Sequence, residues 1–219
     1  MADTKNCGLS PVFPKEDAAR PEFWEKRFRE GFTPWDSGGI PLALESFLGR
    51  EPRGARVLIP GCGSGYEVRA FAQAGFETLA IDFAPAAVER AQRTLGPLAH
   101  LVRLADFFEF DFALPFDLVY ERAFLCALPR RLWPHYAPRV WQLLKPEGRL
   151  AGFFFFDDGE RGPPFGLKVR ELEALLSDRF ERIADAEVGD SIPIFAAKER
   201  WQIWSPRQKL LNPTCKPSK

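Results

Sequence analysis

The sequence has no excess charge of either sign, no long apolar run and no apolar segment at its start. Its 30 basic residues balance 30 acidic residues, so no overall electrostatic field draws the chain to nucleic acid or to an anionic membrane. The longest apolar run, residues 150–156, has the length of a strand, whereas a membrane helix needs roughly 20 residues. Residues 1–23 lack the apolar core of a secretory signal. We therefore expect a cytoplasmic protein that binds neither nucleic acid nor membrane.

Cysteine and histidine are also scarce, with four and two residues. The cysteines show no CxxC spacing; they are Cys7, Cys62, Cys126 and Cys215. This pattern is typical of reduced cytosolic thiols and argues against a disulfide framework. Asp157 and Asp158 are adjacent acids with no histidine nearby, so we predict no metal site.

Strand-like apolar segments alternate with helical patterns, which is typical of a parallel sheet covered by helices on both faces. We predict strands at residues 56–59, 77–81, 100–105, 116–120, 149–156, 180–188 and 199–204, the last two as an antiparallel pair. We predict helices at residues 21–29, 41–48, 66–74, 85–95, 132–144 and 168–176, with a turn at 145–148. The expected organisation is a loose arm (1–20), one α/β domain (21–206) and a flexible tail (207–219).

A glycine-rich loop at residues 60–65, with the sequence PGCGSG, leaves the first predicted strand and enters a helix. This context is what a nucleotide-type binding loop requires. Gly61, Gly63 and Gly65 would let the backbone pass close to a ligand, where a Cβ would block the approach. The alternative is a tight turn that binds nothing.

The acid that ends the next predicted strand supports a ligand. Asp82 lies 21 residues after Gly61, and a carboxylate there can accept hydrogen bonds from both hydroxyls of a ribose. Phe83, which follows it, is assigned to the same site. Glu67 stands too near the helix start to suit a pyrophosphate. It is compatible with a sulfonium cofactor that carries an amino-acid tail, so we predict S-adenosyl-L-methionine rather than NAD.

The third predicted strand ends in Ala105-Asp106-Phe107-Phe108. In folds of this kind the position lies beside the adenine. Asp106 is expected to accept from the exocyclic amine and Phe107 to pack on the ring. The alternative for Phe107 and Phe108 is a place in the hydrophobic core.

Together these residues resemble the thiopurine methyltransferase superfamily, and most closely its halide/thiol methyltransferase branch. The resemblance runs in order through residues 23–204. Its segments are Trp24-Glu25-Lys26, Gly31, Thr33-Pro34-Trp35-Asp36, Pro60-Gly61-Cys62-Gly63, Asp106-Phe107-Phe108, Phe116-Asp117-Leu118-Val119-Tyr120, Phe124-Leu125-Cys126-Ala127, Leu143-Leu144-Lys145-Pro146, Gly162-Pro163-Pro164-Phe165 and Ser191-Ile192-Pro193. The Thr-Pro-Trp-Asp and Gly-Pro-Pro-aromatic segments are the most specific.

The resemblance implies a class I S-adenosyl-L-methionine-dependent methyltransferase fold. This fold has a mostly parallel seven-stranded sheet, an antiparallel C-terminal strand, helices on both faces and an N-terminal helical lid. It also implies a monomeric or weakly associated protein in which Trp24 and Trp35 of the lid close over the cofactor. A tryptophan face is a good partner for a sulfonium cation. The alternative is that both tryptophans only staple the lid to the body.

Two departures from the plant-type enzymes concern the acceptor. Phe165 stands where those enzymes carry tyrosine, so a role for that hydroxyl does not transfer. Glu121-Arg122 stands where they carry Asp-Tyr, and an acid-arginine pair resembles the thiopurine branch. We expect Glu121 at the cofactor, and Arg122, Cys126 and Phe165 in the substrate pocket. Arg122 would steer an anionic acceptor; the alternative is an ion pair with Glu121 or another acid.

The expected reaction is an in-line displacement at an already activated methyl group. A soft nucleophile then needs alignment and loss of water more than a general base. His100 and His135 are accordingly not expected to be catalytic. We predict transfer to the sulfur of a small thiol, hydrosulfide or thiopurine-like compound. The alternatives are a halide or a selenium or tellurium oxyanion as acceptor, and a cofactor-binding regulatory protein without turnover.

Overall fold

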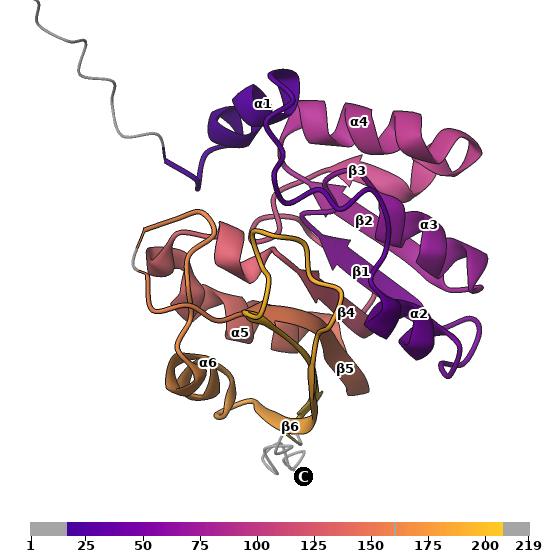
Figure 1. Ribbon diagram of the computed structural model, residues 1–219. Coiled ribbons are helices and arrows are strands. Elements are labelled where there is room, and N and C mark those ends of the chain that lie inside the picture. Colours follow the sequence, from indigo (N-terminus) through magenta and orange to yellow (C-terminus); the bar gives the residue numbers. More distant parts are fainter. Residues whose placement is uncertain (1–16, 160, 208–219) are drawn as a thin grey trace, which may run out of the picture.

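Seven strands form one sheet in the order β3-β2-β1-β4-β5-β7-β6 (Figure 1). The computed structural model describes residues 17–159 and 161–207, so Cys7, Cys215 and most of the predicted arm and tail lie outside the described residues. The strands are β1 (Arg56–Pro60), β2 (Glu77–Asp82), β3 (Val102–Leu104), β4 (Phe116–Arg122), β5 (Leu144–Phe155), β6 (Phe180–Glu187) and β7 (Glu199–Pro206). Strand β7 runs antiparallel to β5 and β6, and the other neighbours are parallel. The predicted mostly parallel sheet is confirmed.

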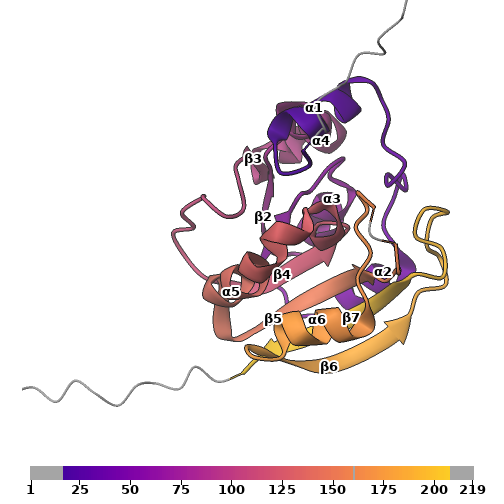
Figure 2. The same cartoon turned by 90° about the vertical axis from the view of Figure 1, so that its left-hand side faces the viewer.

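Helices cover both faces of the sheet, as the two views show (Figures 1 and 2). They are α1 (Pro21–Arg29), α2 (Leu42–Leu48), α3 (Tyr66–Gln73), α4 (Pro85–Leu95), α5 (Trp133–Leu143) and α6 (Val169–Leu176). Short 3₁₀ helices occupy Gly96–Leu101, Leu125–Ala127 and Arg130–Leu132. Among the helices of the described residues, none combines the length and apolarity that a membrane-spanning helix requires.

Strand alternation divides most of the buried side chains between two large cores. Along β1, Val57 and Ile59 join the core beneath α2, α3 and α4, whereas Leu58 joins the core beneath α5 and α6. Successive side chains of a strand point to opposite faces, so a continuous apolar strand must be covered on both sides. This is why the uninterrupted apolar runs in the sequence became inner strands.

The predicted lid, which includes α1 and extends to Trp35, is attached to the rest of the domain by charged groups. Glu25 of α1 accepts a hydrogen bond from the backbone N–H of Ala86 in the first turn of α4 (2.6 Å). Arg29 forms an ion pair with Glu89 on the same helix (3.2 Å). A carboxylate at a helix N-terminus is stabilised by the unpaired N–H groups there. Helix α1 therefore lies over the start of α4, at the rim of the sheet.

Most element boundaries lie within two residues of the sequence prediction, and three regions differ in kind. Residues 100–101 belong to a 3₁₀ helix, so β3 begins only at Val102. The predicted turn at 145–148 is a bulge at the start of β5: Phe116 pairs with Leu144 but Leu118 pairs with Arg149. Residues 17–20, assigned to the loose arm, are docked, because Asp17 pairs with Arg131 at 2.6 Å. The bulge results from the pairing of β5 with β4. Local sequence patterns do not reveal this pairing, because the two strands are far apart in the chain.

Candidate active site

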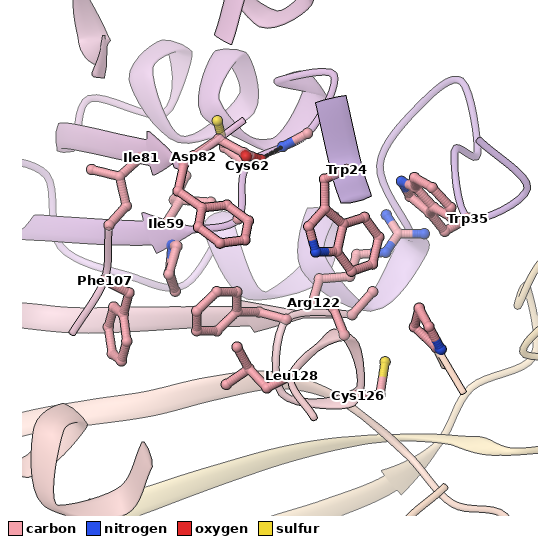
Figure 3. Close-up of a pocket in the computed structure, with 18 of the residues that line it drawn as sticks. Trp24, Trp35, Ile59, Cys62, Ile81, Asp82, Phe107, Arg122, Cys126 and Leu128 are labelled. Atoms are coloured by element: carbon pink, nitrogen blue, oxygen red, sulfur yellow. Dashed lines mark hydrogen bonds between the residues drawn. The ribbon is translucent and has the colours of Figure 1, made fainter. Parts of the chain in front are cut away.

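An open cavity lies at the carboxyl ends of β1, β2 and β4, beneath the lid (Figure 3). Strand β1 lies between β2 and β4, so the chain order reverses there. Ligands of open α/β sheets bind at such a point, because the loops on either side diverge and leave a crevice. The sequence-predicted residues that line the cavity are Trp24, Trp35, Gly61, Gly63, Asp82, Phe83, Asp106, Phe107, Arg122 and Cys126. Three others, Gly65, Glu121 and Phe165, do not line it.

Two glycines of the loop keep its backbone close to the cavity. Gly61 and Gly63 have φ angles of +61° and +51°, a region that residues with a Cβ rarely adopt. A Cβ on Gly61 would lie 2.6 Å from Cδ2 of Phe124. The chain therefore needs glycine at this position for both backbone conformation and space.

Gly65 packs against a helix and does not line the cavity, contrary to the prediction. A Cβ on this residue would lie 3.2 Å from the Cβ of Ala91 and 3.4 Å from Cδ1 of Leu95. Both neighbours belong to α4, so Gly65 lets the start of α3 approach α4. The assignment of Gly65 to the cofactor site is not supported, because the third glycine of the motif faces a helix rather than the cavity.

Asp82 is 7% exposed, and its carboxylate faces the glycine loop. Its Oδ2 accepts a hydrogen bond from the Gly63 N–H (3.2 Å), and its Oδ1 accepts from the Ala84 N–H (3.0 Å). Burial raises the pKa of Asp82 to about 6, although these hydrogen bonds lower it. Each carboxylate oxygen has a second lone pair. Asp82 thus joins the loop to the end of β2 and retains acceptor capacity for a ligand.

The segment after β3 forms another wall. Asp106 turns the chain by accepting the Phe108 N–H at Oδ1 (2.7 Å), and Arg139 of α5 holds the carbonyl of Phe107 (3.0 Å). The Phe107 ring is 4% exposed and meets Phe124 edge to face at 5.1 Å. Phe107 is therefore both a core residue and a wall of the cavity, so the two roles weighed for it are not exclusive.

The two lid tryptophans lie side by side at one end of the cavity (Figure 3). Their rings meet edge to face at 5.4 Å, and the Trp24 indole N–H donates to the carbonyl of Ala18 (2.8 Å). Asp36, next to Trp35, accepts from the Ser64 hydroxyl (2.5 Å) and from Arg90 (2.8 Å). The lid is thereby fastened to the glycine loop, a link that the sequence pattern did not reveal.

Arg122 is paired with Glu67 of α3, not with its neighbour Glu121. Its Nη1 lies 2.7 Å from Oε1 of Glu67, and both side chains are largely buried. Adjacent residues of a strand point to opposite faces, so Glu121 points towards α5 while Arg122 points towards α3. Glu67 and Arg122 both line the cavity. The site therefore holds a charge-balanced pair rather than a single exposed cation.

Glu121 does not fulfil the cofactor role expected of it. It is 1% exposed, and its carboxylate accepts from the N–H groups of Phe124 and Leu125 and from the Tyr136 hydroxyl. Burial raises the pKa of Glu121 to about 7. All these partners are protein groups, so Glu121 stabilises the segment that forms the cavity wall and does not line the cavity itself.

The end of the cavity beside Trp35 is apolar. Cys126 is 4% exposed and packs with Phe155, Phe195 and Trp35 in one cluster. Burial raises the pKa of the Cys126 thiol well above its ordinary value, so the thiol is neutral at physiological pH.

Phe165 does not line the cavity and packs against the core beneath α5 and α6. Its N–H donates to the Cys126 carbonyl (2.7 Å), and the prolines before it, Pro163 and Pro164, line the cavity instead. Phe124, Ile194 and Phe195 are lining residues that sequence reasoning missed. The Ser191-Ile192-Pro193 segment points only indirectly to Ile194 and Phe195, which follow it in the chain.

Among the residues that the structure describes, the Tyr120 hydroxyl has no hydrogen-bond partner, although the residue is only 1% exposed. A buried donor without a partner costs about 1–3 kcal/mol. We therefore expect Tyr120→Phe to increase the free energy of unfolding by about 1–3 kcal/mol, measured by urea denaturation. A decrease would contradict this reading, because it would mean that the hydroxyl is stabilised by a partner in solution.

Comparison with known proteins places the chain in a family. The family model named thiopurine S-methyltransferase matches residues 19–212. A probable thiol methyltransferase 2 of Arabidopsis thaliana is 36% identical over 160 residues, which cover 70% of each chain. Thiocyanate methyltransferase 1 of Brassica oleracea is 31% identical over 207 residues, covering 88% of this chain and 92% of that protein.

A solved structure of similar shape agrees with the fold. It is 1,6-didemethyltoxoflavin-N1-methyltransferase of Burkholderia thailandensis, with its substrate and S-adenosylhomocysteine bound. The TM-score is 0.67 at 21% identity, over 86% of this chain and 87% of that one. The predicted class I fold is thus confirmed. With the family match, the chain belongs to the thiopurine S-methyltransferase family and is an S-adenosyl-L-methionine-dependent methyltransferase.

Proposed function

We propose that this protein transfers the methyl group of S-adenosyl-L-methionine to the sulfur of a small thiol, hydrosulfide or thiopurine-like compound. The observation that carries the proposal is one cavity with two different ends. One end is bordered by the glycine loop, Asp82 and Asp106, and the other by apolar side chains around Cys126 and Phe195. Two ligands of different chemistry can meet in such a cavity.

The first end fits the cofactor. Gly61 and Gly63 leave the loop backbone uncovered, Asp82 has free acceptor capacity for ribose hydroxyls, and Phe107 offers an apolar wall for a base. Asp106 is proposed to accept from the adenine amine. S-Adenosyl-L-methionine supplies a methyl group on a positively charged sulfur, already activated for displacement. The lid tryptophans would face this charge, because an indole face attracts cations.

The second end fits a nucleophile that needs no general base. No histidine or lysine is present among the cavity-lining residues that the structure describes, and the Glu67 carboxylate is already paired with Arg122. Apolar walls remove water from an anion and so raise its reactivity towards a cationic centre. A thiolate meets this requirement, whereas an alcohol or amine nucleophile would need a proton acceptor. Alignment within the cavity would supply most of the rate enhancement.

Arg122 is proposed to guide the anionic acceptor. A guanidinium has five N–H donors, and the ion pair with Glu67 uses one of them. Donors that remain can meet an incoming anion without breaking that pair. Cys126 is proposed as an inert part of the apolar wall, since burial keeps its thiol protonated.

The proposal is tested with isotopically labelled cofactor and a panel of acceptors that includes a small thiol, hydrosulfide, a thiopurine and iodide. We expect transfer to at least one sulfur nucleophile, and competition between thiol and iodide ranks the halide alternative. Absence of transfer to every sulfur acceptor would contradict the proposal. Binding of the cofactor by calorimetry without any turnover would instead indicate the regulatory alternative.

We also propose that the protein acts as a monomer in the cytoplasm. The free buried thiols Cys62 and Cys126 suit a reducing compartment. Light scattering during size-exclusion chromatography, with and without cofactor, checks the monomer, because a second copy would double the mass.

A further inference from the structure

Glu121 does not line the cavity, and its carboxylate accepts hydrogen bonds from residues that form or support the cavity wall. Its Oε1 accepts the N–H groups of Phe124 (2.8 Å) and Leu125 (3.0 Å), and its Oε2 accepts the Tyr136 hydroxyl (2.8 Å). A buried carboxylate is costly unless several donors compensate it. Because two of these donors are backbone groups, the carboxylate fixes the path of the chain rather than a single side chain.

The path that it fixes is unusual. Ala123 has a φ angle of +55°, a region that residues with a Cβ seldom occupy. Such strained residues persist only where their surroundings determine them, and they gather at functional sites. Here the two following N–H groups are held by Glu121. Residues 123, 124 and 126–128 all line the cavity, so the strained residue begins a cavity wall.

The ring of Phe124 makes this wall important for the cofactor end. Its Cδ2 lies 2.6 Å from the place where a Cβ on Gly61 would stand, and its centroid is 5.1 Å from that of Phe107. The ring therefore closes the space between the glycine loop and the segment after β3. A displacement of Phe124 would alter both parts of the proposed cofactor site together.

We propose that Glu121 is a positioning residue for cofactor binding: it holds the turn at residues 123–125 so that the Phe124 ring stands between Gly61 and Phe107. This inference rests on the proposed function, and it replaces direct contact between Glu121 and the cofactor. It also explains why an acid follows Tyr120 in the chain although its side chain faces away from the cavity.

The test compares substitutions of Glu121 with a control at Asp117 by calorimetric titration with S-adenosylhomocysteine on folded protein. Glu121→Leu removes every acceptor and is expected to weaken binding about 10-fold or more, because small displacements of a positioned wall cost that much. Glu121→Gln keeps one oxygen that can accept both backbone N–H groups, and is expected to stay within about 3-fold of the unchanged protein. Recovery by the conservative variant separates positioning from charge.

Asp117→Leu is the matched control. Asp117 is an acid of the same strand at the opposite end from the cavity, and it accepts the Arg56 N–H and the Lys145 amine, each at 2.8 Å. Its loss is expected to lower stability without changing the affinity for S-adenosylhomocysteine. If Glu121→Leu behaves in the same way, Glu121 is only a structural residue and the inference is wrong.

Two further results are decisive. Where Glu121→Leu does not fold, Glu121→Asp keeps the charge but shortens the side chain by one methylene, and unchanged affinity in this folded variant also overturns the inference. Failure of the unchanged protein to bind S-adenosylhomocysteine would overturn the proposed function itself. The two failures are therefore distinguishable in one series of titrations.

Discussion

Replacement of Gly61 by alanine is expected to lower the affinity for S-adenosylhomocysteine by about 100-fold. Overpacking costs about 1–3 kcal/mol and a left-handed conformation adds roughly 1–2 kcal/mol for a residue with a Cβ. Each 1.4 kcal/mol is about a factor of ten in affinity. The new Cβ would stand 2.6 Å from the Phe124 ring, so the ring or the loop must move. Either movement alters the cavity.

Gly96→Ala is the control for this prediction, because it places a Cβ on a glycine of similar φ that does not line the cavity. Gly96 has a φ angle of +59°, close to the +61° of Gly61, but nothing lies within 4 Å of its added Cβ. This variant is expected to lose stability while its affinity stays unchanged. Calorimetry of both variants gives the comparison; equal affinities would show that Gly61 is needed only for the turn.

Replacement of Asp82 by asparagine is expected to separate stability from binding. Loss of charge-assisted hydrogen bonds, worth about 1.5–3 kcal/mol each, should reduce the affinity for S-adenosylhomocysteine by about 100-fold. In the absence of ligand, the ionised carboxylate destabilises the folded state at neutral pH, because burial raises its pKa from 3.8 to about 6. The asparagine variant lacks this destabilising charge.

The pH dependence gives the sign of this effect. A raised pKa means that Asp82 contributes its stabilisation fully below about pH 4 and loses it as the pH rises through about 6. Between pH 4 and pH 8 the stability of Asp82→Asn relative to the unchanged protein should therefore rise, by up to about 3 kcal/mol. Urea denaturation at both pH values measures it.

Asp117→Asn is expected to show the opposite trend. Burial raises the pKa of Asp117, but the Lys145 amine and the Arg56 N–H together lower it below its ordinary value, so its stabilisation is present at neutral pH and is lost in acid. A flat pH profile for Asp82→Asn relative to the unchanged protein would mean that Asp82 is more solvated in solution than its 7% exposure indicates.

The sequence alone determined the fold and the part of the site that is formed by the glycine loop and Asp82. Continuous apolar runs, such as the one at residues 57–59, indicate strands buried on both faces, and their alternation with helices is typical of a parallel sheet. Gly61 follows the first strand, and Asp82 ends the second. Because these two strands are parallel, their carboxyl ends meet at the same edge of the sheet, which brings the loop and the acid together. These features depend on local pattern and on chain order, both of which the sequence contains.

Only the tertiary structure decided which neighbours each functional side chain has. Gly65 belongs to the same motif as Gly61, but the approach of α4 makes it a packing residue. Arg122 and Glu121 are adjacent, yet strand alternation sends one to Glu67 and the other to Tyr136. Contacts between segments far apart in the chain set these partners. A strand pattern can tell which residues share a face, but the packing of helices on that face decides what they meet.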